Sequence, residues 1–159
     1  MKNLKQAGQN QIVLFTLDEP RYALYLSAVE RVVRAVEITP LPKAPGIVLG
    51  VINWQGKILP VMDSRRRFHL PERETDPDDR FIIARAAGRL VALAAESVTG
   101  LRGLTDLEEA SAAQAVPYAE HLKGVAKVEG DLVLICDLDR FLSLDEEQKL
   151  DAALTGAGS

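Results

Sequence analysis

Two aspartates are the residues of this sequence whose positions could support catalysis. Asp63 and Asp137 stand at matching places in two similar stretches, GVINWQGKILPVMD (50–63) and GVAKVEGDLVLICD (124–137). In an aspartic protease, duplicated halves bring two carboxylates together so that they share one proton. That chemistry needs Ser or Thr and then Gly after the acid, whereas this chain continues with SR after one aspartate and LD after the other. We therefore expect each aspartate to end a strand and to cap the turn that follows.

The remaining polar residues do not indicate another kind of reactive site. His69 and His121 lack acidic or cysteine partners at the spacing of metal ligands, and Cys136 is the only cysteine. No glycine-rich phosphate loop lies between a strand and a long helix. The basic run 65–67 is followed closely by acidic residues, and the net charge of −4 has the wrong sign for binding a phosphate backbone. We expect no catalytic residue, no metal, no cofactor and no nucleic-acid partner.

The length of 159 residues and the hydrophobic content of 47% are typical of one compact domain, or of two small units that share an interior. No apolar run approaches the roughly 20 residues that a membrane helix needs. The N-terminal lysines precede only the short apolar run IVLFTL, whereas a secretory signal has a longer apolar region and a cleavage site. These features predict a cytoplasmic protein that does not insert into the membrane.

The local pattern predicts short strands joined by turns. Residues 12–26 hold two apolar runs separated by the turn residues DEP, which favours a pair of strands. Ser27 stands three residues before Glu30, the spacing of a capping box, so one helical turn should lead into the next strand. The stretch 50–63 is expected to form a hairpin, with Gly56 at its tip because glycine accepts a positive φ without a Cβ clash.

The pattern restarts after a polar linker at 71–80, PERETDPDDR. Residues 81–94 again contain two apolar runs with a glycine between them, which predicts another strand pair. A second Ser-x-x-Glu spacing, at Ser143 and Glu146, predicts the start of a terminal helix over 143–154, followed by a frayed end at 156–159.

The chain resembles itself at two shifts. A shift of 66 places Phe15 on Phe81 and Leu24 on Leu90, and a shift of 74 places the first hairpin on 124–137. Two shifts that agree in order favour the duplication of a half-length unit. A small sheet in each half would close most easily into a barrel, because closure removes exposed strand edges. Since one barrel of about 65 residues is marginally stable alone, two would pack together and bury a shared apolar layer.

The expected fold is therefore mainly β, with two small five-stranded SH3-like barrels packed together and a C-terminal helix. We place the first barrel nominally at 12–70, the second at 80–145, and the helix with its frayed tail at 146–159. Strands can cross between the barrels, so the linker is only a nominal boundary.

A groove between two barrels would offer a binding site. Val29, Val32 and the hairpin tip at Trp54 and Gln55 would line it, and such a groove suits an amphipathic helix from a partner. Trp54 is the only tryptophan of the chain and stands at a tip that is hard to bury within one barrel, which favours a contact role.

The run APGIVLGVINWQGKILPVMDSRRRFHL (44–70) resembles the central segment of CheW-like domains. That segment carries an apolar-Gly-apolar-Ile-Asn-Leu-Arg-Gly stretch and then a Pro-Val-x-Asp-Leu-Arg strand end. Residues 15–32 resemble the opening strand pair of the family, 90–101 its third quarter, and 124–142 its closing hairpin. The resemblance spans about residues 12–145.

The resemblance implies a non-catalytic adaptor with a double five-stranded barrel, in the cytoplasm of a bacterium. Such adaptors link the cytoplasmic tips of chemoreceptors to the regulatory domain of a CheA-type histidine kinase, which has the same fold. One barrel face would pair with that kinase domain, and receptor helices would dock in the groove. Because transient signalling interfaces are often small, we expect a monomer alone and assembly only with partners.

Two departures from the family pattern fall at the expected receptor contact. The family commonly has a Glu two residues after Val29 and an Arg at the place of Gln55, an acid–base pair associated with receptor contact. This chain has Arg31 and Gln55 there, with Glu30 one place early, and Trp54 replaces the usual leucine. The residues expected to contact the receptor are Val29, Glu30, Arg31, Val32, Trp54 and Gln55.

Two other functions remain open from the residues alone. One is a tandem SH3-like interaction module in another signalling complex, and the other is a hydrolase that uses the two aspartates. Duplication is compatible with all three functions, whereas the hairpin segment and its match across the chain favour the adaptor.

The glycines expected at structural turns are Gly50, Gly56, Gly124 and Gly130.

Overall fold

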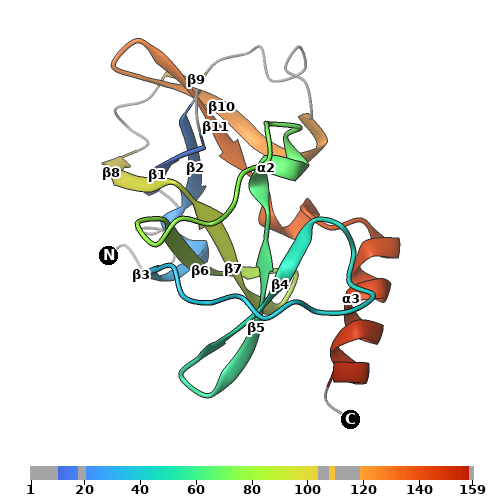
Figure 1. Ribbon diagram of the computed structural model, residues 1–159. Coiled ribbons are helices and arrows are strands. Elements are labelled where there is room, and N and C mark those ends of the chain that lie inside the picture. The colour runs from blue at the N-terminus through green and yellow to red at the C-terminus, as the bar shows by residue number, and fades with distance from the viewer. Residues whose placement is uncertain (1–10, 18–20, 104–107, 110–118, 158–159) are drawn as a thin grey trace, which may run out of the picture.

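The computed structural model describes residues 11–17, 21–103, 108–109 and 119–157, which form two β-sheets and a C-terminal helix (Figure 1). The five-stranded sheet contains, in spatial order, β3 (Val29–Arg34), β6 (Arg80–Ala86), β7 (Arg89–Ala95), β5 (Lys57–Met62) and β4 (Val48–Trp54). The six-stranded sheet contains β8 (Ser97–Gly103), β1 (Gln11–Thr16), β2 (Arg21–Tyr25), β11 (Asp131–Cys136), β10 (Leu122–Val128) and the two-residue β9 (Glu108–Glu109). The helices are η1 (Leu26–Ala28), α2 (Ser64–Arg67), η4 (Ala119–His121), η5 (Leu138–Arg140) and α3 (Leu144–Ala157). The predicted fold class, mainly β with two small five-stranded units packed together and a C-terminal helix, is confirmed, and the two-residue β9 adds a sixth strand to one of the units.

The two sheets exchange their first hairpins. The β1–β2 hairpin from the start of the chain lies beside β10 and β11, whereas the β6–β7 hairpin from the second half lies beside β4 and β5 (Figure 1). The exchanged hairpins join their sheets through parallel pairs, β2 with β11 and β5 with β7. The chain passes from one sheet to the other at η1 and passes back at Glu96, between β7 and β8. The sheets therefore do not correspond to the two halves of the sequence.

Strand register shows that the two sheets are built alike. The β4–β5 and β10–β11 hairpins share one register at a shift of 74, including a bulge after Val48 and after Leu122. For the other strands the matching shift is 69. Phe15 pairs with Val98, and Ala84, which is 69 residues after Phe15, pairs with Val29, which is 69 residues before Val98. The predicted shift of 66 is therefore wrong by three residues. Since β1 and β6 are buried on both faces, their sequences lack the period-two alternation that fixes a register.

Three apolar clusters fill the fold. The largest, which we call the shared core, lies between the sheets and includes Phe15, Tyr22, Leu24, Met62, Ile82, Leu93, Leu138, Phe141 and Leu150. The inner core of the five-stranded sheet contains Ile52, Leu59, Val61, Phe81, Ile83 and Ala92. The inner core of the six-stranded sheet contains Ile12, Leu14, Ala23, Ala126, Val128, Val133 and Ile135. Alternate residues of β6 enter the shared core and an inner core, so this strand stabilises two layers at once.

The β4–β5 hairpin ends in a two-residue turn. Gln55 has φ +53° and Gly56 has φ +80°, the combination of a type I′ turn, and the Asn53 side-chain oxygen accepts a hydrogen bond from the Gly56 N–H at 3.0 Å. Gly130 has φ +84° in the matching turn between β10 and β11. The other two glycines expected at turns, Gly50 and Gly124, lie instead within β4 and β10.

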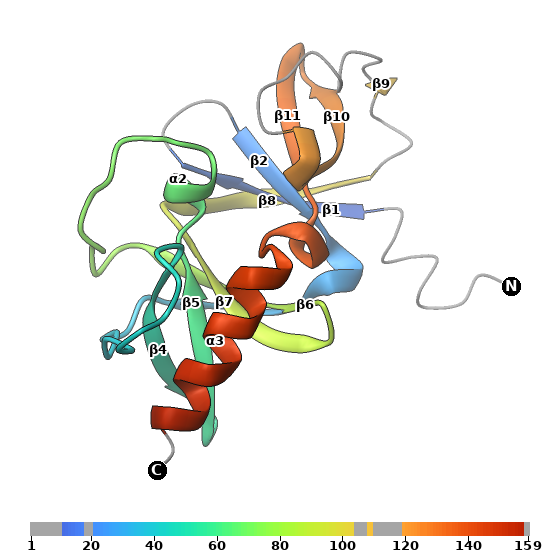
Figure 2. The same cartoon turned by 90° about the vertical axis from the view of Figure 1, so that its right-hand side faces the viewer.

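Helix α3 begins with the capping box that its sequence predicts. The Ser143 N–H donates to Glu146 Oε1 at 2.9 Å, and the Glu146 N–H donates to Ser143 Oγ at 3.1 Å. Burial alone would raise the pKa of the Glu146 carboxyl, but hydrogen bonds from Ser143 and Arg67 outweigh it and lower that pKa. Figure 2 draws the helix in front of β5 and β7, and its Leu150 side chain enters the shared core. It also continues through residues 156–157, beyond the expected start of fraying.

The other predicted capping box does not form. A single 3-10 turn, η1, does lead into β3 as expected, but its N-cap residue Tyr25 makes no side-chain cap bond. Glu30 is instead an extra residue at a bulge of β3, and its carboxylate accepts a hydrogen bond from Arg85 on β6 at 3.1 Å. Among the described residues, no helix is both long enough and apolar enough to span a bilayer.

Candidate partner-binding site

The two aspartates that could have formed a catalytic pair lie in different sheets. Asp63 follows β5 and caps α2, because its side chain accepts hydrogen bonds from the backbone N–H groups of Arg65 at 3.0 Å and Arg66 at 3.4 Å. Asp137 follows β11, but its side chain makes no cap bond with η5. The expected cap is therefore confirmed at Asp63 and wrong at Asp137, where a 3-10 turn replaces the α-helical turn of the other half.

Replacing Asp63 with alanine should lower the free energy of unfolding by about 1–2 kcal/mol, the usual cost of losing an N-cap. Asp137→Ala is the matched control, and it should cost less because no cap bond is lost. Urea denaturation of both variants measures the difference. Equal destabilisation by the two substitutions would contradict the capping role of Asp63.

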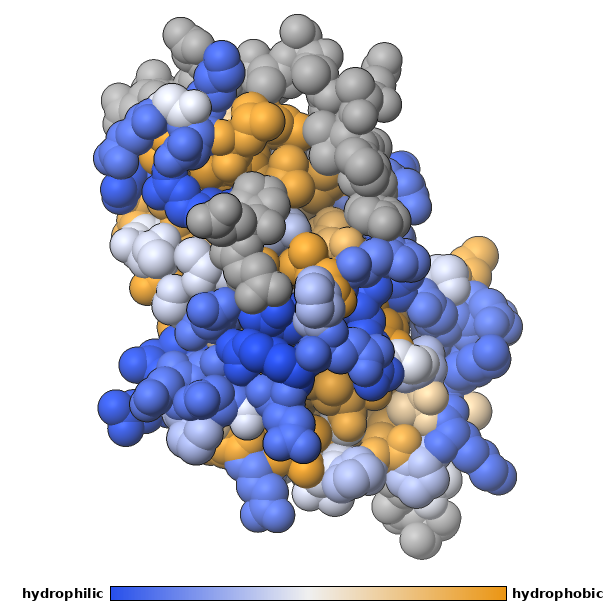
Figure 3. All heavy atoms as spheres, turned by 45° about the horizontal axis from the view of Figure 1, so that its top comes forward, coloured by the Kyte–Doolittle hydropathy of each residue, from blue (hydrophilic) through white to orange (hydrophobic). Residues whose placement is uncertain are grey.

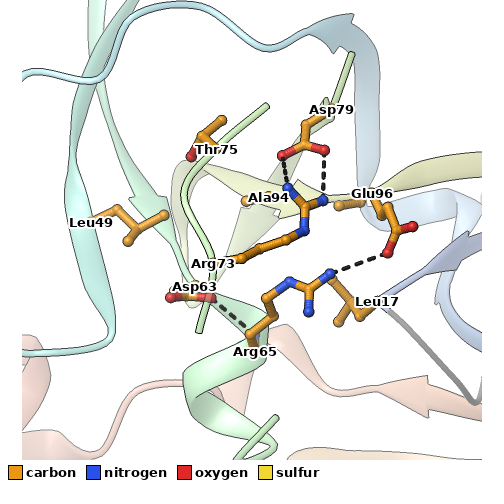
Figure 4. A pocket seen from close by; sticks show the side chains of 10 residues that line it. Leu17, Leu49, Asp63, Arg65, Arg73, Thr75, Asp79, Ala94 and Glu96 are labelled. Atoms are coloured by element: carbon orange, nitrogen blue, oxygen red, sulfur yellow. Dashed lines mark hydrogen bonds and ion pairs between the residues drawn. The ribbon is translucent and has the colours of Figure 1, made fainter. Parts of the chain in front are cut away.

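A second cluster of charged residues connects α2 with the linker and with Glu96. Arg65 of α2 binds Glu96 at 3.1 Å and donates to the Pro71 carbonyl oxygen of the linker at 3.4 Å. Within the linker, Arg73 binds both carboxylate oxygens of Asp79, at 2.7 and 3.1 Å (Figure 4). The hydrogen bond with Asp79 raises the pKa of the Arg73 guanidinium. The cavity beside these residues measures only about 20 Å³, which is room for a water molecule and not for a substrate. The arrangement is that of a structural clamp between α2, the linker and Glu96, where the chain returns to the six-stranded sheet.

The predicted contact residues on β3 point to two different sides of the sheet. Val29 and Val32 lie opposite β6 residues of the shared core, so both face the space between the sheets. Arg31 lies opposite Ile83, a residue of the inner core, and therefore faces the other side. Glu30 lies at the bulge between Val29 and Arg31 and has no paired residue on β6. The β3 residues that were expected to contact the receptor therefore do not all lie on one face of the sheet.

Trp54 lies on the same side of the five-stranded sheet as Arg31, and Gln55 follows it in the hairpin turn. Trp54 is half-buried and packs against the inner core of the five-stranded sheet, and Gln55 occupies the exposed turn that follows. Among the described residues, Arg31 and Gln55 make no hydrogen bond with each other, so they do not replace the acid–base pair of the resemblance. Val29 and Val32 border the space between the sheets, whereas Arg31 and Trp54 lie on the inner-core side and Gln55 lies in the turn at the end of the hairpin.

A groove between the sheets lies beside Val29 and Glu30. This inter-sheet groove is about 220 Å³ in volume, and its lining residues are Leu24, Tyr25, Ser27, Ala28, Arg85, Lys123, Cys136, Leu138 and Asp139. It forms where η1 carries the chain from one sheet to the other. Burial raises the pKa of the Cys136 thiol, so this residue is a neutral part of the floor. Sequence reasoning missed Arg85 and Lys123, because hairpin exchange brings their strands to the same groove.

Large apolar side chains are exposed at matching positions in both sheets. Val32 of β3 is 36% exposed and Leu101 of β8 is 50% exposed; Ile58 of β5 is 56% exposed and Leu132 of β11 is 47% exposed. On the face drawn in Figure 3, hydrophilic residues form a band across the middle, with hydrophobic residues on both sides of it. The exposed apolar side chains are thus distributed over both sheets.

Comparison with known proteins gives a consistent result. A family model described as CheW-like domain matches residues 11–146. The chain is 26% identical over 148 residues to chemotaxis protein CheW of Treponema pallidum, which covers 89% of this chain and 87% of the relative. It is 27% identical over 143 residues to chemotaxis protein CheW of Thermotoga maritima, with coverage of 89% and 94%.

A solved structure agrees with these relatives. The crystal structure of the scaffolding protein TtCheW from Thermoanaerobacter tengcongensis matches this chain with a TM-score of 0.76 and 29% identity, over 87% of this chain and 95% of that protein. The family model covers nearly the whole chain, and the shared architecture extends over both sheets. The protein therefore belongs to the CheW-like domain family.

Proposed function

We propose that this protein couples the cytoplasmic tips of chemoreceptors to the regulatory domain of a CheA-type histidine kinase. The family match over residues 11–146 carries this proposal, and the likeness to a solved scaffolding protein supports it. The protein acts as a non-catalytic adaptor of chemosensory signal transduction. It works in the cytoplasm and is a monomer until its partners assemble with it. The relatives favour this role over a tandem SH3-like module of another complex.

The inter-sheet groove is the proposed receptor site. Its floor is apolar, and Val29 and Val32 of the neighbouring strand face the same side of the sheet. Helix-in-groove recognition uses apolar anchors spaced along one face of a helix, and a receptor tip is built of helices. Trp54 and Arg31 lie on the other side of the sheet and Gln55 lies in the turn beyond it, so we assign these three residues a second receptor contact, outside the groove.

The exposed apolar residues that recur in both sheets suit the kinase partner. A kinase domain with the same double-sheet fold carries positions equivalent to Ile58 and Leu132 of this chain. An interface between two such domains can therefore use the end of one sheet from each partner. Interfaces of this kind are commonly of modest area, which suits a complex that forms only when receptor, kinase and adaptor are together.

Co-sedimentation with receptor-containing membranes and kinase, scored by kinase activity, tests the function directly. We expect kinase to sediment with the receptors, and to respond to receptor ligand, only when the adaptor is present. Val29→Glu should lower the amount of adaptor bound to receptor, because it places a charge on an apolar contact surface. The proposal is wrong if the wild-type adaptor sediments with neither partner.

The residues at 31 and 55 should alter receptor preference. Restoring the pattern of the resemblance with Arg31→Glu and Gln55→Arg should strengthen binding to a receptor tip of a typical CheW partner, because the acid–base pair is then available. Binding assays with wild type and the double variant measure this change. Strong wild-type binding to such a tip, unaffected by Gln55→Ala, would contradict a shifted specificity.

A further inference from the structure

The inter-sheet groove has the size of an anchoring pocket for side chains. Its floor is formed by Leu24, Cys136 and Leu138, which are 1%, 2% and 5% exposed. A volume of about 220 Å³ lies below the ~300–1,000 Å³ that is typical of small-molecule sites. The groove therefore accommodates one or two apolar side chains that project from a partner, which agrees with a docked helix.

Two cations, Arg85 and Lys123, line the rim of the groove. Lys123 is exposed, its Nζ lies 5.2 Å from the centre of the Tyr25 ring, and it has no carboxylate partner among the described residues. Arg85 pairs with Glu30 at 3.1 Å, and both of these side chains are substantially exposed to solvent. The one carboxylate in the lining, that of Asp139, already accepts a hydrogen bond from the Ala87 N–H at 2.7 Å.

We propose that Arg85 and Lys123 select a partner helix that carries acidic residues beside its apolar anchor. In the same proposal, Glu30 competes with that helix for Arg85. This inference rests on the proposed receptor site and adds the charge of the segment that occupies it. Arg85, Lys123 and Asp139 give the lining a net charge of +1, opposite in sign to the −4 of the whole chain, and Glu30 offsets that charge while it pairs with Arg85. Charge complementarity of this kind selects partners and sets association rates.

The size of the effect follows from the exposure of these groups. An exposed ion pair contributes about 0.2–1 kcal/mol, which corresponds to a change of roughly 1.4- to 5-fold in affinity. Lys123→Gln and Arg85→Gln should each weaken binding by up to about 5-fold, and Glu30→Gln should strengthen it to a similar extent. All three differences should shrink as ionic strength rises, because salt screens exposed charges.

Lys127→Gln is the matched control, because Lys127 is an exposed cation on the same strand that does not line the groove. The experiment titrates each variant with a receptor tip fragment at low and high salt. A second fragment has glutamines in place of the acidic residues next to its apolar anchor. With the acidic fragment, the rim variants should differ from Lys127→Gln, and with the neutral fragment they should not.

The outcomes separate the two proposals. If wild type binds neither fragment, the receptor site itself is wrong. If wild type binds but the rim variants match Lys127→Gln on the acidic fragment, or if Glu30→Gln weakens binding, the selection of acidic helices is overturned while the receptor site stands. Thermal unfolding of each variant confirms that the folded protein is compared.

Discussion

Replacing Gly50 with alanine is expected to lower the free energy of unfolding by about 3–5 kcal/mol, from overpacking and backbone strain together. A Cβ at this position would lie 2.3 Å from the carbonyl oxygen of Thr39 and 2.7 Å from Ile38 Cγ2. The Thr39 oxygen cannot easily withdraw, because it accepts a hydrogen bond from the Val51 N–H at 2.8 Å. Gly50 also has φ +153°, a conformation that side chains rarely adopt.

Gly124 provides the control for this prediction, because it holds the equivalent place in the other sheet. Gly124 pairs with Ile135 as Gly50 pairs with Val61, but a Cβ at Gly124 meets no atom within 4 Å. Gly124→Ala should therefore change the free energy of unfolding by less than about 0.5 kcal/mol. Urea denaturation of the two variants makes the comparison. If both unfold at the same urea concentration, the close approach of the 38–39 segment does not constrain position 50.

Leu150→Ala should destabilise the protein by about 3–5 kcal/mol, the cost of a cavity at a fully buried leucine. The Leu150 side chain is 0% exposed, and it is the largest side chain of α3 that is a buried member of the shared core. Both sheets contribute to that core, so the substitution should weaken the whole fold and not only the helix. A single unfolding transition at lower temperature is the expected result in a thermal melt.

Leu144→Ala is the control in the same helix. Leu144 is 77% exposed at the first position of α3, so its loss should change stability by less than about 0.5 kcal/mol. Circular dichroism and tryptophan fluorescence should report the same midpoint for each variant. A loss of helix signal from Leu150→Ala well below the transition of the sheets would show that α3 is not part of the cooperative unit.

The sequence predicted local structure well where one residue type decides the geometry. The turn at Gly56 and the capping box of Ser143 and Glu146 follow from short-range hydrogen bonds and from the φ angles that glycine allows. The cap at Asp63 was also predictable, whereas the same inference failed at Asp137, where the chain forms a 3-10 turn.

Strand partners and the composition of the groove were harder to predict. The first hairpin and the β6–β7 hairpin are both apolar on two faces, so either sheet could accept either hairpin by sequence pattern alone. The exchange depends on parallel pairing with β11 and β5, which no local signal records. Arg85 and Lys123 become neighbours of one groove only through that exchange, and sequence analysis therefore omitted them from the expected contact residues.

The hairpin exchange also constrains the order of events during synthesis on the ribosome. The five-stranded sheet has all of its strands once residue 95 has emerged, but the β1–β2 hairpin must wait for β8, β10 and β11, which end at residue 136. Until then, an apolar hairpin made first is left without its final neighbours. Strand pairing between segments that are distant in the sequence slows folding. Until it is complete, the unpaired strand edges can pair with the wrong strands. A nascent chain arrested shortly after residue 100 should consequently recruit chaperones more strongly than the released protein.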